Sequence, residues 1–133
     1  MIGSQHEQLK IIRIMKNDKA TKSAGIHILL DFYGAKNINS MKFVKKSLVE
    51  AIRASKFKLI KINLHKFSPH GVSGVAIIAE SHISIHTWPE YNFAAIDIFV
   101  CGGKNARPAI KSLKKAFKPK RAVCNEILRG KLT

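Results

Sequence analysis

Four strand-length segments rich in apolar residues follow one another in the middle of the chain, and this succession most constrains the fold. The gaps between them are only a few residues long, which favours antiparallel pairing because parallel strands need a crossover of about a dozen residues. Proline and glycine in the SPHG and WPEYN gaps are typical of turns. The segments cover residues 57–67, 72–79, 82–88 and 93–100.

Two amphipathic helices and two further strands are predicted on either side of this block. Ser40 is a plausible N-cap for a helix over 41–55, and residues 105–118 repeat the pattern of apolar positions on one face and lysines on the other. Apolar runs at 25–34 and 121–128 read as strands. The element order predicts an α/β fold, a two-layer sandwich of a mainly antiparallel sheet with two helices covering one face.

The length and the hydropathy bound the domain organisation. A chain of 133 residues, 46% of them hydrophobic, fits a single domain over 25–133, preceded by an arm of uncertain order at 1–24. No apolar run approaches the roughly 18 to 20 residues of a membrane span, and the start of the chain lacks a secretory signal, so a cytoplasmic location is expected. Cys101 and Cys124 are then expected to be free thiols.

The formal charge of +16 suggests a polyanionic partner, but its distribution argues against one at the centre of the chain. All 24 lysines and arginines lie outside residues 67–103, whereas Glu80, Glu90 and Asp97 lie inside that segment. A site built there favours a small cationic ligand, because carboxylates repel phosphate. A basic nucleic-acid-binding domain stays open as an alternative, with a solvated basic surface as the simpler interpretation.

The stretch AESHISIHTWPE, residues 79–90, concentrates chemically active side chains in a predicted strand. If it pairs in a hairpin with 93–100, partner numbers sum to about 181, and Cys101 returns beside Ser81. Ser73 and His86 are not expected beside Ser81 of the same chain. His86 lies on the opposite pleat face from Ser81, and Ser73 lies about 26 Å from Ser81 along an extended strand. A two-fold partner that supplies its own Ser73 and His86 solves this geometry.

Two enzymatic readings of this stretch are weak. His82, His86 and Glu90 resemble a metal-binding trio, but the alternation is that of a strand and no helix supports the spacing. A serine hydrolase would need a nucleophile elbow of the G-x-S-x-G type, which the chain lacks. Cys101 alone could equally be a small buried apolar residue.

The run FSPHGVSGVAIIAESHISIHTWPEYNFAAIDIFVCG, residues 67–102, closely resembles the short prokaryotic type of S-adenosylmethionine decarboxylase, and weaker resemblance covers residues 25–130. That family is pyruvoyl-dependent and acts in polyamine (spermidine) biosynthesis, where decarboxylated S-adenosylmethionine is the aminopropyl donor. The resemblance implies a homodimer that forms a larger sandwich and shares its active sites between subunits. It implies neither a metal nor pyridoxal phosphate.

The resemblance also implies a role for each matching residue. The Glu80–Ser81 bond would be cut autocatalytically, leaving fragments 1–80 and 81–133 and converting Ser81 to the pyruvoyl group that forms a Schiff base with the substrate. His86 matches the base of processing, Ser73 a hydroxyl that assists it, and Cys101 the proton donor in decarboxylation. Two substrate-binding positions, one for adenine and one for ribose, match Phe67 and Glu90.

The chain departs from the usual family pattern at Ile26, where a basic residue is common, and at Gly103 and Lys104, where acidic residues are common. Related pyruvoyl enzymes decarboxylate arginine or ornithine with the same machinery, and these substrates stay open as an alternative. The HTWPE and SPHGVSGV segments look more like the S-adenosylmethionine enzymes.

Overall fold

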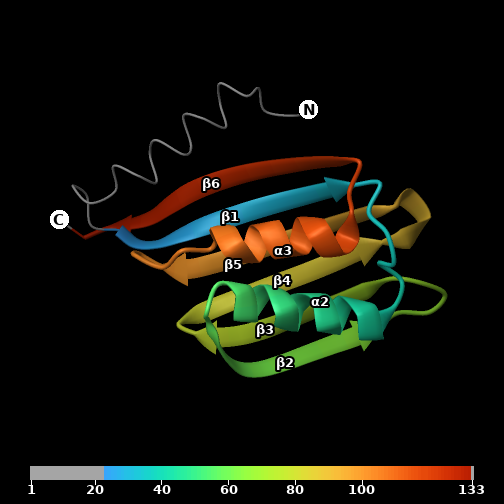
Figure 1. Cartoon of the computed structure of the whole chain (residues 1–133), viewed down its shortest axis with the longest axis horizontal. Coiled ribbons are helices and arrows are strands. Elements are labelled where there is room, and N and C mark those ends of the chain that lie inside the picture. Colours follow the sequence, from blue (N-terminus) through green and yellow to red (C-terminus); the bar gives the residue numbers. More distant parts are fainter. Residues whose placement is uncertain (1–22, 133) are drawn as a thin grey trace.

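The computed structural model describes residues 23–132 as one antiparallel sheet with both helices on one of its faces (Figure 1). The strands lie in the order β2-β3-β4-β5-β1-β6, so the chain enters the sheet near one edge and finishes on that edge. The predicted order and the two-layer arrangement are confirmed. The elements are β1 Ser23–Tyr33, α2 Met41–Ala54, β2 Lys58–Lys66, β3 Val72–Ala79, β4 Ser81–Trp88, the 3-10 turn η2 Pro89–Tyr91, β5 Phe93–Cys101, α3 Arg107–Phe117 and β6 Arg121–Lys131.

Local sequence signals set the ends of the helices. The Ser40 side chain accepts a hydrogen bond from the Phe43 backbone N–H at 3.1 Å, which satisfies one of the unpaired donors at the start of α2. Helix α3 has a proline in its first turn, where no backbone donor is needed, and it ends at Lys118 in the left-handed conformation. Both helices point their apolar faces at the sheet.

Alternation along the strands separates a core face from an open face. In β4, Ile83, Ile85 and Thr87 are buried beneath the helices, whereas the residues between them face the other way. The core combines this face with the buried sides of α2 and α3, including Leu48 and Phe117. The opposite face of the sheet has no covering layer within residues 23–132.

Three details differ from the sequence expectations. The apolar residues Ile60, Ile62 and Leu64 alternate in the sequence of β2, but a register shift between Leu59 and Lys61 leaves Ile60 60% exposed. The segment 72–79 is apolar throughout most of its length, but only Val72, Ala76 and Ile78 are buried because just one face of the sheet is covered. The expected N-terminal arm lies outside the described residues up to position 22, and β1 already begins at Ser23.

No helix within residues 23–132 is long and apolar enough to cross a membrane.

Candidate active site

Ser81 lies at the tight turn that joins β3 to β4. Strand β3 ends at Ala79 and β4 begins at Ser81, so Glu80 is the single residue between the two strands. Ser81 has φ of 125°, a backbone conformation that L residues rarely adopt and that stores strain. The peptide bond between Glu80 and Ser81 therefore stands at a sharply bent, partly exposed position of the sheet.

Cys101 comes next to this turn from the neighbouring strand. Ser81 pairs with Val100 of β5, and partner numbers along β4 and β5 sum to 181, as the hairpin count predicted. Cys101 follows Val100 directly and is a half-buried free thiol. We call Glu80, Ser81 and Cys101 the serine end of the sheet.

Ser73 and His86 meet at the opposite end of the same strands. They are direct partners in the β3–β4 ladder, and Ser73 Oγ lies 2.9 Å from His86 Nδ1 in a hydrogen bond. His86 is five positions from Ser81 along β4, or about 16 Å at the rise of an extended strand. The fold thus joins Ser73 to His86 but keeps both away from Ser81 of the same chain.

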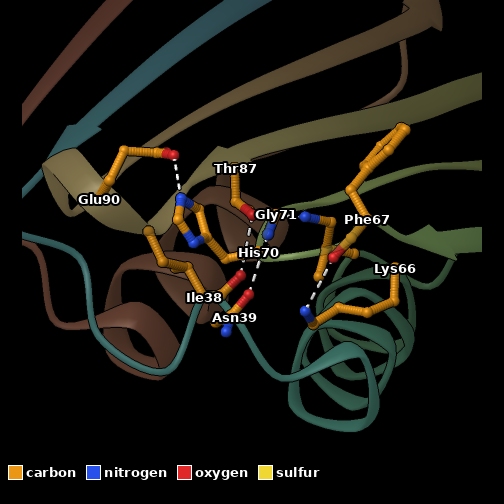
Figure 2. A network of polar contacts seen from close by, with 9 residues as sticks. Ile38, Asn39, Lys66, Phe67, His70, Gly71, Thr87 and Glu90 are labelled. Atoms are coloured by element: carbon orange, nitrogen blue, oxygen red, sulfur yellow. Dashed lines mark hydrogen bonds and ion pairs between the residues drawn. The ribbon is translucent and has the colours of Figure 1, made fainter.

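Phe67 and Glu90 belong to this second end, on the loops that flank it. Figure 2 shows His70, in the β2–β3 loop, hydrogen-bonded through Nε2 to the Glu90 carboxylate in η2. The Phe67 ring is 47% exposed and lies edge-on to His65, with ring centroids 4.5 Å apart. The group Phe67, Ser73, His86 and Glu90 is called the histidine end below.

Buried hydrogen bonds hold the loop of the histidine end in place. The Thr87 hydroxyl donates to the Ile38 carbonyl and accepts from the Val72 backbone N–H, both at 2.9 Å. The Asn39 side chain accepts from the Gly71 backbone N–H at 2.9 Å (Figure 2). The β1–α2 loop therefore fixes where β3 begins, and with it the position of Ser73.

The open face between the two ends is partly apolar. Val75 and Ile77 of β3 and Trp88 of β4 are 38%, 44% and 42% exposed. Near the middle, the Ser84 hydroxyl donates to the Asp97 carboxylate at 3.2 Å. Apolar side chains gathered on one uncovered sheet face are typical of a surface that another layer covers.

The sheet order corrects the expectation that the site lacks positive charge. Strand β6 contributes Arg129, whose guanidinium carbon lies 5.9 Å from the centre of the Phe99 ring on the open face. At the other end of β6, Arg121 stacks on Tyr33 at 4.3 Å. The segment 67–103 has no basic residue, but β6 brings arginines to the face that this segment forms.

Burial perturbs two groups of β6 on the helix-covered face. Desolvation raises the pKa of the Cys124 thiol to about 11, with the Glu126 carboxylate adding to the shift. Desolvation likewise raises the pKa of Glu126 to about 7, against the opposing effect of Arg107. Both groups lie on the helix-covered face, whereas Cys101 lies on the open face, and a thiol whose pKa is raised by burial is unreactive.

His70, Asn39 and Arg129 are the site neighbours that sequence reasoning missed. His70 was read only as part of a turn, and Arg129 lies on a strand whose place beside β1 is not visible in the sequence. The spacing of His82, His86 and Glu90 gives no metal site, since no group of three potential ligands within residues 23–132 could hold an ion.

The chain matches the family model described as S-adenosylmethionine decarboxylase over residues 26–130. It is 44% identical to the S-adenosylmethionine decarboxylase proenzyme of Methanococcus maripaludis strain C7 over 112 residues, covering 82% of this chain and 92% of the relative. The proenzyme of Thermomicrobium roseum is 40% identical over 111 residues, covering 82% and 96%.

Solved structures agree with this match. The adenosylmethionine decarboxylase of Aquifex aeolicus superposes with a TM-score of 0.79 at 35% identity, covering 84% of this chain and 95% of that one. A Trypanosoma brucei AdoMetDC monomer, at 17% identity and a TM-score of 0.56, shares the fold and is covered over only 44% of its length.

Proposed function

Because this chain belongs to the S-adenosylmethionine decarboxylase family, we propose that it cuts itself at Glu80–Ser81 and then removes the carboxylate of S-adenosylmethionine. The observation that carries the proposal is the serine end, where a strained serine follows a glutamate at a hairpin turn and a thiol comes next to it on the adjacent strand. Neither a nucleic-acid-binding domain nor an arginine or ornithine decarboxylase is favoured by these relatives.

Processing starts from the chain's own residues. The Ser81 hydroxyl attacks the Glu80 carbonyl carbon, so that a C–O bond forms as the C–N bond breaks and an ester links the two residues. Removal of the Ser81 α-proton then breaks the Cβ–Oγ bond, and Glu80 leaves as a carboxylate. Hydrolysis of the remaining dehydroalanine releases ammonia and gives the pyruvoyl group at position 81. The products are fragments 1–80 and 81–133.

The serine end fits a pyruvoyl group. The turn leaves Ser81 partly exposed, and no hydrogen bond within residues 23–132 ties its side chain to a competing role. When formed, the group supplies a ketone that withdraws the electrons released as CO2 departs. Cys101 holds the proton that is delivered to the substrate α-carbon.

The base for processing comes from a second subunit. His86 is about 16 Å from Ser81 of its own chain, beyond the reach of a hydrogen bond. Two sheets stacked on their open faces, about a two-fold axis that lies between them and perpendicular to β4, place the histidine end of each over the serine end of the other. Exposed apolar residues on the open face support such a dimer.

In that dimer the partner's His86 accepts the proton removed from the Ser81 α-carbon. The partner's Ser73 donates a hydrogen bond to the oxyanion that develops on the Glu80 carbonyl. The hydrogen bond between Ser73 and His86 orients the imidazole. Glu90 binds the ribose hydroxyls with its position fixed by His70, and the exposed Phe67 ring stacks on adenine.

The test is release of CO2 from carboxyl-labelled S-adenosylmethionine, compared with arginine and ornithine. We expect release from S-adenosylmethionine alone and none from the Ser81→Ala chain. Release from arginine or ornithine at a higher kcat/KM would refute the substrate assignment.

A further inference from the structure

We infer that Arg129 binds the α-carboxylate of the substrate, and this inference rests on the proposed function. Arg129 of β6 pairs with Gly25 of β1, which pairs in turn with Cys101 of β5. Paired residues of neighbouring strands point to the same face, so Arg129 and Cys101 share the open face at the serine end. The residue between them is Gly25, and the Phe99 ring occupies the space that a side chain would fill there.

The Arg129 side chain reaches across β1 toward the site. The guanidinium carbon lies 5.9 Å from the centre of the Phe99 ring, although Phe99 stands two strands away, or about 10 Å at the usual strand spacing. The ring lies over Gly25, because a Cβ atom on that residue would fall 2.9 Å from Phe99 Cζ. The ring holds the guanidinium by a cation–π contact and directs it toward the strand that carries Cys101.

Two groups that contact the Phe99 ring, Arg129 and His27, are available to bind an anion. Within residues 23–132, Arg129 makes neither an ion pair nor a hydrogen bond. His27 packs edge-on against the same ring at 5.5 Å, and its Nε2 atom is buried without a hydrogen-bond partner in that part of the chain. A permanently charged guanidinium beside an unsatisfied imidazole suits a carboxylate, which accepts two hydrogen bonds at once.

The only anion of the proposed substrate is its α-carboxylate. That group is bonded to the carbon that Cys101 protonates, so it must lie at the serine end. It leaves as neutral CO2, and the attraction to Arg129 is lost as the bond breaks. Arg129 therefore strengthens substrate binding without stabilising the transition state further.

The experiment compares Arg129→Met with wild type in the processed enzyme. Methionine removes the charge and keeps apolar contact with the ring. We expect KM for S-adenosylmethionine to rise about 10- to 100-fold, the effect of losing a charge-assisted hydrogen-bonded pair, with kcat unchanged or higher. The Kd of the decarboxylated product, measured by equilibrium dialysis, should not change because this ligand has no carboxylate.

Lys131→Met is the matched control, since it removes one positive charge two residues further along β6 and should leave all three constants unaltered. Arg129→Lys keeps the charge without the two-pronged geometry and should raise KM less than Arg129→Met does. If Arg129→Met does not fold, the comparison of KM, kcat and product Kd is made with Arg129→Lys instead.

Equal weakening of substrate and product binding would overturn the inference, as would a fall in kcat. A folded Arg129→Met chain that stays uncut would also overturn it by placing Arg129 in processing or in the dimer interface. Failure of the proposed function looks different, because the wild-type chain itself would then stay uncut or release no CO2.

Discussion

A mixture of two inactive variants should recover self-cleavage if, as we propose, each site takes its serine end from one subunit and its histidine end from the other. Ser81→Ala removes the nucleophile and leaves His86 intact, whereas His86→Ala does the reverse. In a mixed dimer one site then combines Ser81 of one subunit with the partner's His86, and the other site lacks both.

The expected fraction of cleaved chains follows from how the two variants associate into dimers. Random association of equal amounts gives about half mixed dimers, in which only the chain carrying His86→Ala can be cut. About one quarter of all chains should therefore be cleaved, against none if the roughly 16 Å between Ser81 and His86 were bridged within one chain. Coexpression followed by intact-mass measurement counts the cut chains.

A mixture of Ser73→Ala and His86→Ala is the matched control, since both changes damage the histidine end and no site in the mixed dimer is whole. It should show no more cleavage than the two variants expressed alone. Absence of cleavage in the Ser81→Ala and His86→Ala mixture, with mixed dimers shown to form, would refute the shared site.

Two further predictions concern stability. Thr87→Val leaves the Ile38 carbonyl and the Val72 backbone N–H unpaired in the interior. In thermal unfolding, the free energy of unfolding should therefore fall by about 2 to 4 kcal/mol and the melting temperature by about 6 to 15 °C. A change below about 0.5 kcal/mol would contradict the role given to these hydrogen bonds. Burial raises the pKa of Glu126 to about 7, so the folded chain binds its proton more tightly than the unfolded chain, and stability should decline as pH rises from about 4.5 to 7. Allowing for its partial exposure, Glu126→Gln should recover about 1 to 2 kcal/mol at pH 8 and flatten this part of the urea-unfolding profile, and an unchanged profile would refute the assignment.

Much of the fold could be predicted from the sequence because local signals agree with the final packing. Ser40 is a helix-capping residue, and the apolar spacing that follows it also indicates a helix. The short gaps between the predicted strands indicate antiparallel hairpins. The pairing of Ser81 with Val100 needed only the position of one turn. These relations are close in sequence, so they can be counted along the chain.

Contacts between segments that are far apart in the sequence could not be predicted. That β6 lies beside β1, and carries Arg129 to the face that holds Cys101, depends on the order of strands in the whole sheet. The contact between His70 and Glu90 joins two loops whose shapes the sequence does not specify. The exposure of Ile60 could not be predicted either, because a register shift in β2 interrupts the alternation of Ile60, Ile62 and Leu64.

The intact mass of the purified protein after incubation shows whether this chain makes its own catalytic group. We expect two fragments, 1–80 and 81–133, with a ketone in place of the amine at the start of the second, and a single uncut chain for Ser81→Ala. A wild-type chain that keeps its full 133-residue mass would contradict it.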